Sequence, residues 1–242
     1  MISLVEVRTS CARENDLSNR RLHFFASRFS IYFSWLFINL GLSANQVTAL
    51  FFIVGFLGGL CFLNPEPILV FAGYFLWRLH VIFDLCDGDV ARYTQKFSIN
   101  GAYWDYMVHS ILYPLYFVCA CVSAYSRYEA GHFLYMGAFG GIIVSQILSV
   151  KNNYYRAMLV SKLELVKGDV SETLAKRNFL KELTLHILSF EGFLFVYVLV
   201  VLLGLGEIAE VLVFTFYLLV FLALIAAKFY LFSVKGNYSK RA

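Results

Sequence analysis

The feature that most constrains the fold is a series of long apolar runs that carry almost no charge. Several of them hold about 18 or more residues, which is the length that a helix needs to cross a bilayer. The composition agrees, since 60% of the residues are hydrophobic, 18% are aromatic and the mean hydropathy is +0.69. A soluble domain does not carry this much apolar sequence. We therefore predict an all-α integral membrane protein.

Six transmembrane helices are expected, and the residues at their ends explain where the first one begins and stops. Ser43 can cap a helix whose third residue, Gln46, reaches back to it, as in a capping box. The sequence NPEP at 64–67 is a turn that no helix can cross. The expected spans are 45–62, 68 into the charged stretch at 84, 101–125, 133–150, 183–203 and 208–232.

The region before the first span is predicted to lie outside the membrane core. Residues 1–20 are polar and are expected to form a loosely ordered cytosolic leader. Residues 21–40 are apolar but interrupted by Arg28, which favours an amphipathic helix lying along the membrane interface. We thus divide the chain into a leader with an interfacial helix, 1–42, and a six-helix transmembrane domain, 43–242.

Lysines and arginines gather in every second connection between the expected spans, which places most of them on one side of the membrane. They gather before the first span, between the second and third, between the fourth and fifth, and after the sixth. The positive-inside rule then places both termini in the cytosol. We expect the cell (inner) membrane as the location. The net charge of +4 is too small and too dispersed to indicate a nucleic-acid partner. The five cysteines show no zinc-binding spacing.

A charged stretch interrupts the apolar sequence where the second and third spans reach the cytosol. Asp84 and Asp87 share one helix face, and Asp105 and His109 share a face of the next helix. Carboxylates at membrane depth must be balanced by cations. Arg92 and Lys96 supply part of that charge, and oxygen ligands of this kind favour Mg²⁺, Mn²⁺ or Ca²⁺.

Small residues accompany these charges. Gly88, Ala91 and Gly101 lie on or beside the same faces and would let a substrate approach the backbone closely. The alternative is a structural ion-pair cluster that locks two helices together. Four aspartates within 22 residues favour a functional site instead, because intramembrane charge usually has a function. Asp89, the aspartate outside this pattern, is expected to face water.

The pattern as a whole resembles the signature of the CDP-alcohol phosphotransferase (CDP-alcohol phosphatidyltransferase) family. It consists of Asp84-x2-Asp87-Gly88-x2-Ala91-Arg92-x8-Gly101-x3-Asp105-x3-His109. In the family the last position is normally a fourth aspartate, so His109 is a departure. The six spans, the interfacial helix and the sequence SANQVT before the first span also fit the family's layout.

The resemblance implies transfer of a substituted phosphate from a CDP-linked donor to an acceptor alcohol, with release of CMP. The donor would be CDP-diacylglycerol or another CDP-alcohol, and the product would belong to phospholipid, lipid-linked or glycan biosynthesis. The resemblance also implies Mg²⁺ or Mn²⁺ as cofactor, membrane lipids as partners and a homodimer.

The family's functional positions can be carried over one by one. The metal positions match Asp84, Asp87 and Asp105, with His109 at the fourth. Catalysis is expected to depend on His109 as the base, and on Asp105 and Arg92. The positions around the nucleotide match these residues: Asp84, Gly88, Ala91, Arg92 and Gly101.

His109 changes the chemistry of that fourth position. An imidazole keeps a base that can accept the acceptor's proton at neutral pH, but it removes one carboxylate from the metal site. We therefore expect a weaker second metal site and better activity with Mn²⁺ than with Mg²⁺. The alternative is a relative that binds nucleotide but has lost catalysis, or a transporter or scaffold.

Overall fold

The computed structural model describes residues 2–11, 24–97, 99–161, 163–165, 179–234 and 238–240. The chain divides into two compact units, Met1–Leu112 and Tyr113–Ala242. The boundary falls within helix α6 (Ile99–Tyr128), two residues before Pro114. Proline has no backbone N–H, so it removes one hydrogen bond from the helix at this place.

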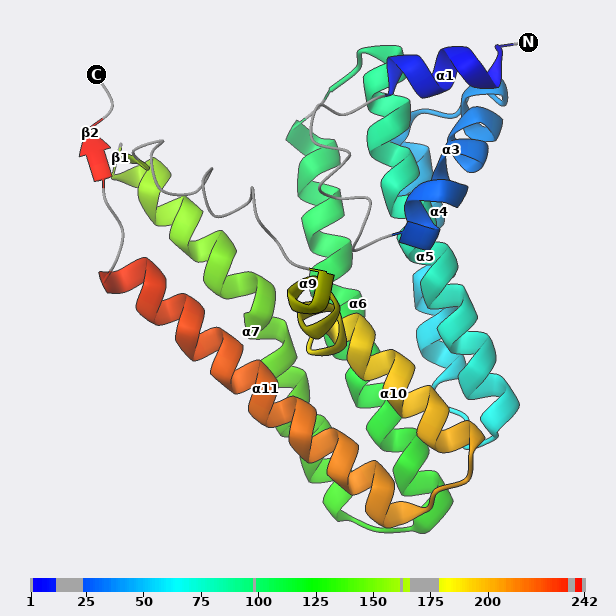
Figure 1. Ribbon diagram of the computed structural model, residues 1–242, viewed down its shortest axis with the longest axis vertical. Coiled ribbons are helices and arrows are strands. Elements are labelled where there is room, and N and C mark those ends of the chain that lie inside the picture. Colours follow the sequence, from blue (N-terminus) through cyan, green and yellow to red (C-terminus); the bar gives the residue numbers. More distant parts are fainter. Residues whose placement is uncertain are drawn as a thin grey trace. The chain divides into compact units, whose positions relative to one another are not determined.

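The first unit is built around α4 (Ala44–Cys61) and α5 (Pro67–Thr94), which pack along each other, with α4 largely behind α5 in Figure 1. The predicted capping box is confirmed, since Ser43 accepts from the Gln46 backbone N–H and Gln46 accepts from the Ser43 N–H. The turn at 64–67 is also confirmed, and Pro67 opens α5. Helix α3 (Phe24–Asn39) packs against α5.

The N-terminal leader is more ordered than the sequence suggested. Residues Leu4–Ser10 form the short helix α1, which contacts α3 and α5. The indole of Trp35 donates to the Ile2 carbonyl at 2.7 Å, and the Tyr93 hydroxyl donates to Glu6 at 3.1 Å. The prediction of a loosely ordered leader is thus wrong for residues 2–11, because these polar contacts are long-range and have no periodic signal. Residues 12–20 lie outside the described part.

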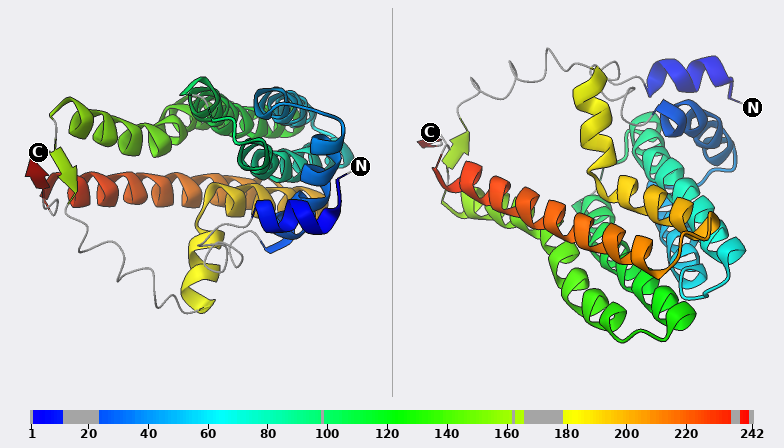
Figure 2. Two further views of the ribbon diagram at one scale, coloured as in Figure 1. Left: turned by 90° about the horizontal axis from the view of Figure 1, so that it is seen from above. Right: turned by 60° about the horizontal axis from the view of Figure 1, so that its bottom comes forward.

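The second unit contains α7 (His132–Val160), α10 (Phe190–Leu202) and α11 (Glu207–Val234), together with the later part of α6. Helices α7 and α11 run side by side in both views of Figure 2. A short antiparallel pairing of β1 (Leu163–Leu165) with β2 (Tyr238–Lys240) follows α7. The other described elements are all helices, as predicted.

Five of the described helices are long and apolar enough to cross a membrane, namely α4, α5, α6, α7 and α11. They match five of the six expected spans. The expected span at 183–203 is instead divided into α9 (Phe179–Ile187) and α10. Ser189 caps α10, and a side chain at Gly192 would collide with the carbonyl oxygen of Ile187. The expected single helix over this range is therefore wrong.

A buried ion pair joins α6 to α11 within the second unit. Arg127 donates to both carboxylate oxygens of Glu210, whose side chain is only 1% exposed. The same guanidinium donates to Ser123 and to the Tyr197 hydroxyl, and the Tyr128 hydroxyl donates to Glu210 at 3.0 Å. Each contact has a charged partner and is at least partly buried, so loss of one partner should leave a charge without compensation.

Removal of one partner should be much more harmful than removal of both. In Arg127→Met the buried Glu210 loses its counter-charge, and we expect the protein to lose about 3–5 kcal/mol of stability. Thermal unfolding in detergent measures this loss as a lower midpoint temperature. The double variant Arg127→Met/Glu210→Leu should recover part of it. Arg156→Met, at an exposed position of α7, is the matched control. A single variant as stable as the control would show that the network contributes little.

Candidate active site

Two helices of the first unit bring a carboxylate pair and a histidine together. Asp84 lies on α5, and Asp105 and His109 lie one turn apart on α6. The Nε2 atom of His109 is 3.3 Å from Asp84 Oδ1 and 3.1 Å from Asp105 Oδ1. The three side chains are 20–36% exposed, so the cluster is partly shielded but open to a ligand.

This cluster fits a divalent cation. One ligand atom from each of Asp84, Asp105 and His109 lies within 4.8 Å of the other two. Two carboxylate oxygens and an imidazole nitrogen form a donor set that suits Mn²⁺ or Zn²⁺ as well as Mg²⁺. The predicted gathering of these residues across the two helices is thus present in the structure.

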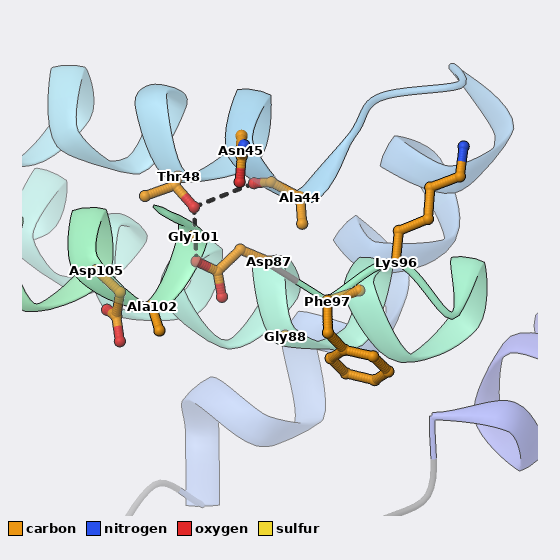
Figure 3. A pocket seen from close by; sticks show the side chains of 11 residues that line it. Ala44, Asn45, Thr48, Asp87, Gly88, Lys96, Phe97, Gly101, Ala102 and Asp105 are labelled. Atoms are coloured by element: carbon orange, nitrogen blue, oxygen red, sulfur yellow. Dashed lines mark hydrogen bonds between the residues drawn. The ribbon is translucent and has the colours of Figure 1, made fainter. Parts of the chain in front are cut away.

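Asp87 lies beside the cluster but is not one of its three members. It accepts a hydrogen bond from the Thr48 hydroxyl at 2.8 Å, and Thr48 also donates to the Ala44 carbonyl (Figure 3). Because Thr48 is on α4, this bond ties the start of α4 to the charged part of α5. One carboxylate oxygen of Asp87 is therefore already engaged with protein.

A pocket with a volume of about 330 Å³ opens next to the cluster. Asp87 and Asp105 line it, and in Figure 3 they lie near Thr48, whereas Lys96 and Phe97 lie at the other end of the view. The predicted small residues are all present in the lining: Gly88, Ala91 and Gly101. Their lack of bulk leaves room for a ligand close to the backbone, as expected.

Arg92 is held by an ion pair within its own helix. Its guanidinium binds Asp89, which is 8% exposed and also accepts from the buried Ser34 hydroxyl at 2.8 Å. The prediction that Asp89 faces water is wrong, because Asp89 is buried and bonded to Ser34 of α3. The described residues that line the pocket do not include Arg92, Asp84 or His109.

Several pocket residues were not predicted as site residues. Asn45 and Thr48 come from the first turns of α4, and Phe97 follows α5. Helix α5 ends at Thr94, and the next residue, Gln95, caps it with a positive φ of 54° and donates from its side chain to the Arg92 carbonyl. This sharp end places Lys96 and Phe97 at the pocket. The sequence signal that could have found Asn45 and Thr48 was the predicted cap at Ser43, because a helix that begins after Ser43 carries both residues in its first turns.

Comparison with known proteins agrees with this geometry. No curated protein matches the chain closely enough to count as a relative. The family model for CDP-alcohol phosphatidyltransferase matches residues 41–169, which is more than half of the chain and includes α4, α5, α6 and the whole charged motif. The chain therefore belongs to the CDP-alcohol phosphatidyltransferase family.

Proposed function

We propose that this protein transfers a substituted phosphate from a CDP-linked donor to an acceptor alcohol and releases CMP. The observation that carries the proposal is the cluster of Asp84, Asp105 and His109 beside a pocket with small residues. The family is one of transferases that use CDP-alcohols. The product belongs to lipid, lipid-linked or glycan biosynthesis, and the donor is CDP-diacylglycerol or another CDP-alcohol.

The roles of the residues follow from their charge and position. Divalent metal would be held by Asp84, Asp87, Asp105 and His109, and when bound it would offset negative charge on the pyrophosphate of the donor. His109 accepts the proton of the acceptor hydroxyl.

The nucleotide lies along the small residues of the pocket, which permit close approach to the backbone. Gly88, Ala91 and Gly101 support this position because they line the pocket. Asp84 and Arg92 contribute from beside it, and Arg92 acts in catalysis by stabilising negative charge once it is oriented by Asp89.

A panel of CDP-alcohols tests the proposal directly. The purified protein is incubated in lipid nanodiscs with Mg²⁺ or Mn²⁺, a candidate donor and an acceptor alcohol, and CMP is measured. Release of CMP that depends on both substrates is the expected result. If the protein binds CDP-alcohols but releases no CMP from any donor, a binding-only relative is favoured. The observation that favours this second candidate is His109 at the position of a family aspartate.

We further propose that both termini and the active site face the cytosol, in the inner membrane, and that the chain forms a homodimer. The domain division at residues 42 and 43 and the interfacial role of α3 belong to the same proposal. A sixth crossing by the 179–202 region is needed for this orientation. Helix α10 alone has 13 residues, or about 20 Å at the α-helical rise, compared with about 30 Å of hydrocarbon core.

Reporter fusions test this topology. A reporter fused after Ala242 and another inserted near Gly168 should both be cytosolic, because lysines and arginines surround both places. Opposite locations would mean that the chain between them crosses the membrane an odd number of times, rather than twice as proposed. A reporter in the 129–131 loop, which the proposal places outside, is the control.

A further inference from the structure

A second histidine lies beneath the cluster and has an unusual environment. His80 is fully buried on α5, one helical turn before Asp84. Its Nδ1 atom lies 3.0 Å from the carbonyl oxygen of Phe51. A carbonyl oxygen can only accept, so Nδ1 carries the proton and Nε2 keeps a lone pair. That Nε2 atom is buried and has no hydrogen-bond partner within the part of the chain that the structure describes.

This arrangement is typical of a histidine that binds metal. Metal-binding histidines almost always donate their other ring N–H to a carboxylate or a backbone carbonyl, which fixes the tautomer and orients the ring. Here Phe51 provides that carbonyl. A buried nitrogen without a partner costs free energy, so a structural role gives no reason to retain Nε2.

The surroundings hold His80 next to the cluster. Its ring lies edge to face with that of His109, with centroids 5.6 Å apart, and the Phe51 ring contacts both histidines. On the α4 side a β-carbon at Gly55 would lie 2.9 Å from Nδ1 of His80. The absence of a side chain at Gly55 is what makes room for the ring.

Helices α5 and α6 each carry one histidine and one aspartate, and the two residues have the same spacing in both helices. His80 and Asp84 are four residues apart on α5, and Asp105 and His109 are four apart on α6. Four-residue spacing places both members of a pair on one helix face. Two histidines and two carboxylates on facing helices form a recurrent kind of transition-metal site.

We propose that His80 is a further ligand of the metal site, in addition to the compact group of Asp84, Asp105 and His109. The ligand atoms of Asp84, Asp105 and His109 lie within 4.8 Å of one another. His80 is outside that group, so its ring would have to move toward the other three for Nε2 to share a cation with them. The proposal rests on the metal-binding role in the proposed function. It specifies a site with two nitrogen ligands that selects Mn²⁺, Co²⁺ or Zn²⁺ over Mg²⁺, because imidazole is a poor ligand for Mg²⁺.

Cobalt binding tests the proposal without any substrate. Co²⁺ is titrated into the full-length protein in detergent, and its visible absorption reports the ligands and the affinity. The key variant is His80→Asn, because the amide N–H of asparagine can replace the donation to Phe51 but provides no ring nitrogen. We expect Co²⁺ affinity to fall by about 10- to 100-fold and the absorption bands to shift. His132→Asn, at an exposed histidine of α7, should leave both unchanged.

Pulsed EPR of the parent protein loaded with Mn²⁺ counts coordinated imidazoles and does not depend on whether a variant folds. Two coupled imidazoles are expected. One imidazole, or a His80→Asn variant with the affinity and spectrum of the parent, would overturn His80 as a ligand and leave the metal role of the other three intact. A parent protein that binds no divalent cation would overturn both this inference and the metal-dependent part of the proposed function.

Discussion

Asparagine in place of Asp105 is expected to lower CMP release by at least about a hundredfold while leaving the protein folded. Asp105 lies 3.1 Å from His109 and is the one member of the metal cluster that also lines the pocket. The substitution keeps the shape of the side chain but removes a charged oxygen ligand. The measurement is the rate of CMP release, compared with thermal unfolding of the same preparations.

The same change at Asp84 and Asp87 extends this test. Asparagine at 87 can still accept from Thr48, so its effect isolates the charge of Asp87 from its bond to α4. Both variants should also be inactive. Glu66→Gln is the matched control, because Glu66 is exposed and its side chain makes no capping bond. Full activity in Asp87→Asn, or parent activity that persists with excess chelator, would contradict the metal-site proposal.

Much of the fold could be predicted because its signals are local. Hydropathy over a window of about 18 residues identifies α4, α5, α6, α7 and α11. The capping box at Ser43 and Gln46 depends only on residues three apart in sequence. The break between α9 and α10 was missed, since the whole range is apolar and hydropathy does not detect a local cap such as Ser189.

The candidate site was predictable to a different degree at each residue. Spacing along two helices was enough to place Asp84 near Asp105 and His109, as the distances confirm. The positions of Arg92 and Asp89 depended on α3, whose Ser34 bonds to Asp89, and no sequence pattern predicts that contact. Long-range contacts of this kind decide whether a charge faces water or protein.

The histidine at the fourth motif position leads to the last prediction. His109→Ala removes both a metal ligand and the proposed base, and we expect CMP release to fall by about a hundredfold or more. His109→Asp restores a fourth carboxylate and should retain some activity, with a shift in preference from Mn²⁺ toward Mg²⁺. The measurement is CMP release at a series of Mn²⁺ and Mg²⁺ concentrations.

Two outcomes would separate the remaining possibilities for this position. If His109→Ala is as active as the parent, His109 is not the base, and its contacts with Asp84 and Asp105 are structural. If the parent is inert with every donor and His109→Asp is active, the chain binds CDP-alcohols but has lost catalysis through this one residue. His132→Ala, far from the cluster in sequence and exposed, controls for the loss of an imidazole. Because the Nε2 atom of His109 contacts both carboxylates, a Mn²⁺ preference in the active parent that shifts toward Mg²⁺ in His109→Asp would support this nitrogen as a metal ligand.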